Sequence, residues 1–424
     1  MANWAKINLV VLLDEYENFS ARQQRTVNTL LKFHKDHVVY RVGMRLEGFR
    51  TYATVTKDDF IKEGRDYQKA VFDDFLNRKR TGFTEYLLEI ARKRLRSISH
   101  LEKNGLTDIR KFLGKRESLE KEALTLASDR SKKMFRRFEK HLPKGAYRSL
   151  HTTNKPLLDM MAVLYVLRGE SVASVRRAIA EYSAGEKTKA ANRIRYDLSN
   201  KYKLSLVILL ASIYRQKKSY YSFNTFAFLS SGIVGHFLEM CRLSFRHAEF
   251  EDREGLLEGR ISPAIQSKAA REFATRELQQ VKRIEDHGTK LYQMAINLGN
   301  IFREYHSDPF VRYPEMNQFS LDMLELEPPY DVAFRSAIKW SVIQRKNALQ
   351  SGSPGSGRTE IFTLSRAFSP VFELTYRTRG GINEQFDAKD MLALMTTKNV
   401  KPKRDLSARL DETKAREQQG KLGL

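Results

Sequence analysis

The chain is most informative near its start, where it reads Ile7-Asn8-Leu9-Val10-Val11-Leu12-Leu13-Asp14-Glu15-Tyr16-Glu17. A run of aliphatic residues ends abruptly in two adjacent carboxylates, Asp14 and Glu15. A short continuous apolar run is typical of a strand that is buried on both faces of a parallel sheet. Because such sheets bind ligands at the carboxyl ends of their strands, the pattern predicts an acidic pair at a sheet edge.

A buried strand followed by two acids suits nucleotide hydrolysis. In P-loop ATPases the first carboxylate holds magnesium and the second polarises the attacking water. Asp14 would then bind the metal and cofactor, and Glu15 would be catalytic, with ATP and magnesium as cofactors. A phosphate-binding loop normally precedes this strand, so we expect it from an upstream extension or from a partner subunit. Residues 352–359 match the loop template except that Arg358 replaces lysine, and we interpret them as a linker.

The residues that follow predict one crossover of a parallel sheet. A helical pattern covers Ser20 to Phe33, with Ser20 at the N-cap, and a second strand covers Val38 to Arg45. In AAA+ folds the strand in this position carries a sensor beside the γ-phosphate. Arg45 is our candidate for a catalytic sensor and Arg41 for a cofactor-binding residue. The alternative is that both are surface arginines at a strand end.

Composition restricts the class of partner. The 424 residues carry a net charge of +24, an excess that favours nucleic acid or an anionic membrane surface over a merely soluble basic protein. No apolar run reaches the ~20 residues that a membrane span needs, and no signal peptide is visible. The single cysteine, Cys241, excludes a disulfide within the chain and fits a reducing compartment. We therefore predict a cytoplasmic protein with a nucleic-acid partner, DNA being favoured, and no membrane partner.

Changes in composition divide the chain into five segments. Residues 1–78 form the α/β part, residues 79–155 are basic and helical, and residues 156–260 are mostly helical. Residues 261–396 mix helices with strands, and residues 397–424 form a polar tail that we expect to be disordered.

The basic segment holds half of the charge excess. Residues 79–155 contain 21 lysines and arginines against 9 acids, a net charge of +12. Apolar residues recur there at helical spacing, so the cations fall on helical faces. We predict that these helices contact phosphates, and the alternative is a solvated helical face. The candidate nucleic-acid contacts form two clusters, which are Arg92, Lys93, Arg94 and Arg96, and Lys132, Lys133, Arg136 and Arg137.

The C-terminal part predicts two helices and then a hairpin. The helices cover Ala264 to Arg283, after Ser262-Pro263, and Thr289 to Tyr305. Strands at 361–364 and 371–376, with a turn at Gly380-Gly381, suggest a wing hairpin. The basic residues of this wing, and further candidates for phosphate contacts, are Arg366, Arg377 and Arg379.

Several of these stretches resemble one family. The residues from Leu12 to Asn18, and then Gln23 to Leu30, resemble the acidic strand and following helix of the bacterial origin-recognition-like AAA+ ATPases, relatives of the STAND NTPases. Residues 42–45 and 48–51 resemble the segment after that helix. Further similarity covers 229–242, which resembles the lid helix, 261–271, 364–370 and 376–380.

The resemblance implies a P-loop AAA+ core, a helical lid and a winged-helix region, with nucleotide-controlled assembly on DNA. The fold class is then an α/β remnant of a P-loop AAA+ core, followed by a mainly α-helical lid and a winged-helix-like C-terminal region, predominantly α overall. Residues 1–78 would be the partial core, 156–260 the lid and 261–396 the winged-helix-like region. Two departures concern turnover: the phosphate loop has no counterpart, and Gly235 stands near the lid position that often carries a sensor arginine.

Two functions remain open from the sequence. The first is a DNA-associated protein of the origin-recognition-like AAA+/STAND class that binds nucleic-acid backbone under nucleotide control and self-associates or pairs with another subunit. By family analogy, such proteins fit mobile-element or phage-defence systems. The second is a non-catalytic nucleic-acid-binding scaffold or subunit that has lost ATP turnover.

Overall fold

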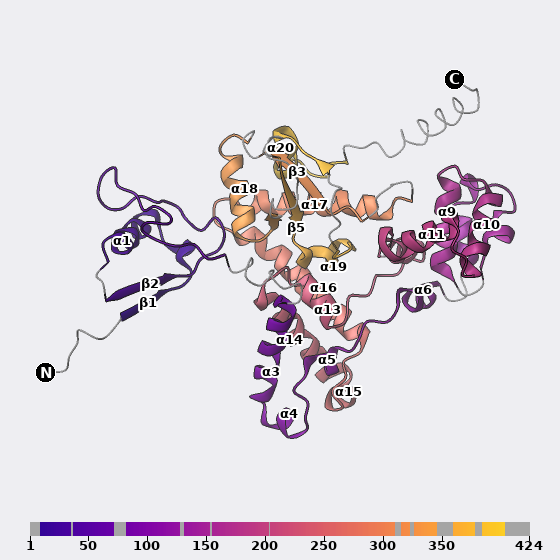
Figure 1. Ribbon diagram of the computed structural model, residues 1–424, viewed down its shortest axis with the longest axis horizontal. Coiled ribbons are helices and arrows are strands. Elements are labelled where there is room, and N and C mark those ends of the chain that lie inside the picture. The colour runs from indigo at the N-terminus through magenta and orange to yellow at the C-terminus, as the bar shows by residue number, and fades with distance from the viewer. Residues whose placement is uncertain are drawn as a thin grey trace.

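The computed structural model describes residues 9–34, 37–71, 82–127, 131–152, 155–202, 204–309, 315–322, 326–345, 359–377 and 384–402, and these residues are mainly helical. Figure 1 shows three parts side by side. We call residues 9–71 the N-terminal unit, residues 82–118 with 215–402 the body, and residues 119–214 the bundle. The body lies between the other two parts (Figure 1). No helix among the described residues is both long and apolar enough to cross a bilayer.

The N-terminal unit is the predicted strand, helix and strand. It consists of β1 (Leu9–Leu13), α1 (Ala21–Lys32) and β2 (Val38–Val42). The two strands pair in parallel, which confirms the crossover, although β2 ends three residues earlier than expected. Ser20 caps α1 in a capping box with Gln23, as its position before the apolar pattern predicted.

The two-stranded sheet leaves aliphatic side chains in solvent. Leu12 is 72% exposed, and Val10 and Val39 are 49% and 44% exposed. The parallel register pairs Val10 with Val39 and Leu12 with Arg41, so these four side chains lie on one face of the sheet. We call this the exposed sheet face. All-parallel sheets normally have both faces covered, so this unit buries less of its apolar surface than its sequence pattern predicts.

The body holds the larger hydrophobic core, to which most of its helices contribute. The pair α16 and α17 confirms the two helices expected after Ser262-Pro263, with Ser262 capping α16. The body helices are α3 (Gly82–Arg96), α4 (Ser99–Lys103), α5 (Ile109–Leu113), α13 (Phe223–Leu229), α14 (Val234–Glu251), α15 (Arg253–Leu257), α16 (Pro263–Gln280), α17 (Gly288–Ser307), α18 (Tyr330–Lys339), α19 (Ser369–Phe372) and α20 (Ala388–Thr396).

A four-stranded sheet completes the body, and its strand order is β4-β5-β3-β6. β5 (Thr359–Leu364) pairs antiparallel with both β3 (Gln318–Asp322) and β4 (Ile343–Arg345). β6 (Glu384–Gln385) pairs in parallel with β3. The strand expected at 361–364 is therefore confirmed, and its hairpin partner is β4, which precedes it in the chain.

The strand expected at 371–376 is wrong. Residues Ser369–Phe372 form α19, with Pro370 in its first turn, where a missing N–H and a fixed φ favour a helix start. Phe372 then packs so closely on α17 that a β-carbon at Gly299 would lie 2.4 Å from its ring. The predicted wing therefore does not form from these residues, and its turn at Gly380-Gly381 lies outside the described residues.

The bundle closes a second core of its own. Every residue of α9 is buried, and α6, α7, α8, α10 and α12 all pack against this helix. The bundle helices are α6 (Leu119–Ala127), α7 (Ser131–Arg137), α8 (Ala146–Leu150), α9 (Pro156–Leu167), α10 (Val172–Ser183), α11 (Lys189–Tyr196) and α12 (Ser205–Ile213). The bundle is thus inserted into the body between α5 and α13.

The two cores do not follow the sequence-based segments. Residues 79–155 contribute α3 and α5 to the body core and α6 to α8 to the bundle core. The start of the expected tail is packed, because Asn297 Nδ2 donates to the Thr397 carbonyl oxygen at 2.7 Å and the Val400 N–H donates to Asn297 Oδ1 at 3.4 Å. Residues 403–424 lie outside the described residues.

Candidate functional site

The carboxyl ends of β1 and β2 meet at the predicted acidic pair. The Gly43 N–H donates to the Leu13 carbonyl oxygen at 2.7 Å, and the Tyr16 N–H donates to the Gly43 carbonyl oxygen at 3.1 Å. A β-carbon at Gly43 would lie 2.9 Å from Asp14 Oδ1. Glycine at 43 therefore lets the Asp14 carboxylate lie against the end of β2.

Both carboxylates of this pair face solvent. Glu15 adopts a left-handed backbone conformation, with φ 53°, and its N–H donates to Asp14 Oδ1 at 2.8 Å. Asn18 Nδ2 donates to Glu15 Oε2 at 3.0 Å. Exposed carboxylate oxygens suit Mg²⁺, which keeps several waters and takes few protein ligands. Within the described residues no group of three or more metal-binding side chains forms, and the metal-binding role of Asp14 stays a prediction.

The two candidate sensor arginines lie in different surroundings. Arg41 is exposed on the exposed sheet face, opposite Leu12. Arg45 instead forms an ion pair with Glu17, Nε to Oε1 at 3.2 Å, and the Glu17 side chain is only 4% exposed. The Arg45 guanidinium carbon also lies 4.5 Å from the centre of the Trp340 ring, in the body. A phosphate-sensing role for either arginine stays a prediction.

The first basic cluster belongs to the body. Arg92, Lys93, Arg94 and Arg96 lie in the C-terminal half of α3, whose Leu87, Ala91 and Leu95 face the core. Lys93, Arg94 and Arg96 are exposed. Arg92 Nη1 donates to Glu89 Oε2 at 2.9 Å, so one of the four charges already has a partner.

The second basic cluster belongs to the bundle and is larger than expected. Arg136 and Arg137 are exposed at the end of α7; Lys132 and Lys133 lie in the same helix, but the structure does not describe their side chains. Three further cations, Lys140, Lys144 and Arg148, are exposed on the following η3 (Glu139–His141), its connection and α8. The sequence-based list missed these three residues. The signal was present, since residues 131–150 contain seven lysines and arginines against one acid.

The two described C-terminal arginines, Arg366 and Arg377, do not lie on the hairpin expected for residues 361–376. Arg366 lies largely buried after β5, its Nε has no hydrogen-bond partner among the described residues, and burial lowers the pKa of its guanidinium. Arg377 is half-buried, and its carbonyl oxygen accepts from Asn317 Nδ2 at 2.7 Å. Arg379 lies outside the described residues. The burial of Arg366 does not suit it to a contact with phosphate.

A buried ion network, which sequence reasoning missed, joins the bundle to the body. Lys218 is fully buried, and its Nζ donates to Glu122 Oε1 of α6 at 3.1 Å. Arg116 Nη2 donates to Glu122 Oε2 at 2.9 Å, and Arg116 also bonds Tyr376. Burial opposes ionisation of Glu122, but Lys218 and Arg116 outweigh it, so the pKa of this carboxyl lies below its ordinary value. No local pattern links residues 116, 122 and 218.

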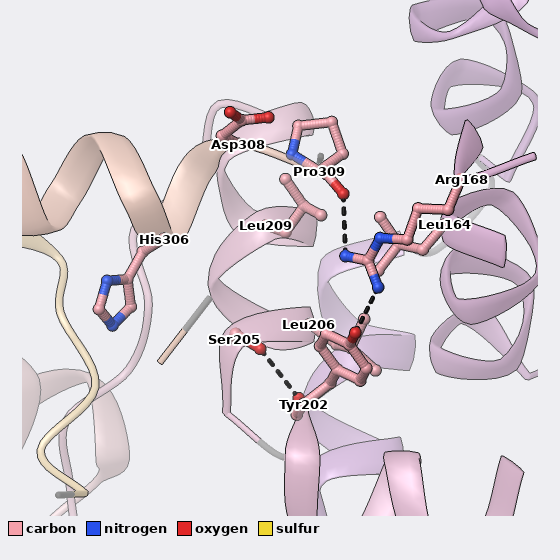
Figure 2. Close-up of a pocket in the computed structure, with 9 residues that line it drawn as sticks. All are labelled: Leu164, Arg168, Tyr202, Ser205, Leu206, Leu209, His306, Asp308 and Pro309. Atoms are coloured by element: carbon pink, nitrogen blue, oxygen red, sulfur yellow. Dashed lines mark hydrogen bonds between the residues drawn. The ribbon is translucent and has the colours of Figure 1, made fainter. Parts of the chain in front are cut away.

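A small pocket lies at the same junction, between the bundle and the end of α17. Figure 2 shows Arg168, at the end of α9, reaching toward Tyr202 and Pro309. Its Nη2 donates to the Pro309 carbonyl oxygen at 3.0 Å. None of the predicted site residues lines this pocket, so it belongs to the contact between the two cores. Cys241 is not a candidate nucleophile either, because burial in the body core raises the pKa of its thiol.

Comparison with family models gives a match that reaches into all three parts of the molecule. A model described as ORC-CDC6-like matches residues 3–383. Comparison with curated proteins and with solved structures gives no match. Proteins of this family have an AAA+ ATPase-related role, generally bind ATP with Mg²⁺, and typically act with DNA and form oligomers. Because the match spans most of the chain, the chain belongs to the ORC-CDC6-like family.

Proposed function

We propose that this chain binds the backbone of nucleic acid, with duplex DNA as its partner, through the basic face of the bundle. We define the basic face as Arg136, Arg137, Lys140, Lys144 and Arg148. The observation that carries the proposal is that these five side chains are exposed and that no described acid forms an ion pair with them. A group of unneutralised cations on adjacent helices attracts a row of phosphates.

The contrast with other cations of the bundle supports a role in binding. Arg177 pairs with Glu181 at 2.9 Å, and Arg193 pairs with Glu170 at 2.6 Å. Each of these arginines has an acidic partner within the bundle. Among the described residues the basic face has no such partners, so its like charges repel one another until an anion binds. Lysine and arginine contacts to phosphate position a protein on nucleic acid without reading its sequence, so we expect little base preference from this face.

The same proposal includes a nucleotide site at the carboxyl ends of β1 and β2 in the N-terminal unit. In a site completed by a phosphate-binding loop from outside the described residues, Asp14 would hold magnesium and Glu15 would orient the attacking water. Arg45 would have to leave Glu17 to reach a γ-phosphate. Support for this site comes from the family, which generally binds ATP with Mg²⁺, and from the meeting of β1 and β2 at Gly43.

The body carries the winged-helix-like part of the proposal. The chain runs from β3 through α18 to the antiparallel pair β4 and β5, and β5 pairs back on β3. A helix followed by a hairpin that pairs back on the first strand is the order of elements expected of a winged module. In this arrangement the hairpin of β4 and β5 takes the place that we had expected for residues 361–376.

A titration of duplex DNA across a salt series tests the proposal. The test variant is R136Q/R137Q/K140Q, and the matched control is K121Q/R177Q/R260Q, which removes the same charge from cations that are paired with Glu117, Glu181 and Glu258. We expect the test variant to bind more weakly and to lose about one unit of salt slope for each phosphate contact removed. Equal affinities of the two variants would overturn the role of the basic face.

Mg-ATP in the same titration separates the enzyme from the scaffold. If ATP shifts the affinity, and Asp14→Asn or Glu15→Gln removes the shift, the acidic pair belongs to a nucleotide site. If neither ATP nor the two substitutions has an effect, the chain acts as a nucleic-acid-binding scaffold. The absence of DNA binding at low salt by the wild-type chain would exclude both functions.

A further inference from the structure

The turn that follows β2 docks on the body through charged side chains. Glu47 lies between two arginines, with Arg335 Nη1 of α18 at 3.5 Å from Oε2 and Arg345 Nη2 of β4 at 3.6 Å from Oε1. Each arginine has a second acid at shorter range, which is Asp331 for Arg335 and Glu360 for Arg345. Glu47 is therefore the more distant of two acidic partners for each arginine, and another anion could replace it. The side chains of Arg335 and Arg345 are 47% and 35% exposed.

The turn of residues 45–48 positions Glu47 beside these two arginines. The Gly48 N–H donates to the Arg45 carbonyl oxygen at 3.0 Å, which closes a turn, and Glu47 occupies the left-handed region in that turn, with φ 58°. Buried Gln24 of α1 fixes the turn from behind, because its Nε2 donates to the Gly48 carbonyl oxygen at 3.1 Å. Non-glycine residues adopt this conformation at a cost, so the presentation of Glu47 depends on the surrounding contacts.

A second contact lies beside the first. Lys339, at the end of α18, donates from Nζ to the Glu17 carbonyl oxygen at 3.2 Å. Arg45 lies over the Trp340 ring and is paired with Glu17. Glu17, Arg45 and Glu47 of the N-terminal unit thus contact one edge of α18 and β4, and the contacts of Glu47 are ion pairs. Ionic contacts between half-exposed groups are weak and salt-sensitive.

From this geometry we propose that Glu47 is an intramolecular competitor of nucleic-acid phosphate at Arg335 and Arg345. The edge of α18 and β4 then binds a polyanion only when the turn of residues 45–48 moves away, so the N-terminal unit holds the body in a closed, low-affinity form. The proposal rests on the proposed function for the identity of the anion. The contact itself does not depend on the basic face, which lies in the bundle.

The test uses the full chain with Glu47→Gln, which keeps the shape and removes the charge. Its matched control is Glu258→Gln, an acid paired with a single arginine on the surface of the body. Because a half-exposed ion pair is worth up to about 1 kcal/mol, we expect Glu47→Gln to raise duplex-DNA affinity about fivefold at low salt. Addition of Arg335→Gln and Arg345→Gln to Glu47→Gln should remove the gain.

Tryptophan fluorescence reports the closed form without DNA. The chain has two tryptophans, so Trp4→Phe leaves Trp340, which lies under Arg45, as the single reporter. We expect Glu47→Gln to increase quenching of Trp340 by acrylamide, and DNA to do the same in the parent protein. If Glu47→Gln and Glu258→Gln match in both affinity and quenching, the competitor role is wrong. If no variant binds DNA, the proposed function fails and this inference fails with it.

Discussion

The bundle buries its apolar residues, whereas the N-terminal unit exposes several of its own. In the bundle all twelve residues of α9 are buried, whereas in the N-terminal unit Leu12 of β1 is 72% exposed. The seven α-helices that the structure describes in the bundle enclose their own core, but a sheet of two strands is too small to do so. The bundle therefore buries its apolar residues in its own core, while the described strands of the N-terminal unit leave several of theirs exposed.

The largest expected effect lies where the bundle joins the body. Glu122→Gln leaves the buried Lys218 ammonium without its counter-charge, and breaking a buried pair from one side typically costs about 3–5 kcal/mol. We expect a clear fall in the urea midpoint, measured by circular dichroism.

The control for this substitution is Glu117→Gln, which removes an exposed partner of Lys121 and should cost less than about 1 kcal/mol. The double variant E122Q/K218M should recover part of the loss, since it also removes the uncompensated charge. If Glu122→Gln is as stable as Glu117→Gln, the network does not hold the bundle on the body.

The pH dependence of stability tests the body near its junction with the bundle, at His306. His306 is buried, donates from Nδ1 to the Phe302 carbonyl oxygen, and accepts the Thr375 N–H at Nε2. Burial lowers its pKa to about 4, so the unfolded chain takes up the proton more readily. The stability that the neutral ring provides is complete above pH 6.5 and falls as the pH decreases from 6.5 to about 4. A shift of this size corresponds to about 3 kcal/mol.

The comparison variant is His306→Gln, whose side chain can donate and accept at similar positions but does not titrate. We expect its unfolding midpoint to fall less than that of the parent between pH 6.5 and 4. Parallel pH profiles of the two proteins would show that His306 is not the group responsible.

The smallest effect sharpens the contrast between the two parts directly. Val10→Thr and Val163→Thr exchange the same methyl group for a hydroxyl, at a position 49% exposed in β1 and at a fully buried position in α9. We expect a loss of about 1–3 kcal/mol at Val163 and less than about 0.5 kcal/mol at Val10. A loss above 1 kcal/mol at Val10 would mean that the exposed sheet face is covered in solution, and sedimentation would then identify self-association.

The parts of the fold that depend on near neighbours could be predicted. The apolar run before Asp14, the cap at Ser20 and the proline at the start of α16 each describe a signal within a few residues, and each predicted element formed. The strand expected at 371–376 failed, because Pro370 starts a helix and the buried environment of Phe372 explains its apolar character equally well. The sequence predicted which residues form the candidate site, but it did not predict which residues contact them.

By itself the sequence determined the parallel crossover, the mainly helical class and the excess of positive charge, because these follow from local periodicity and composition. Only the tertiary structure decided that the two basic clusters lie on different cores, that Arg366 is largely buried, and that Arg45 lies over Trp340. Such contacts join residues that are distant in the chain, and no local pattern records which surfaces will pack together. The physical reason is that burial and ion pairing depend on the whole fold, whereas capping and periodicity depend on one helical turn or one strand.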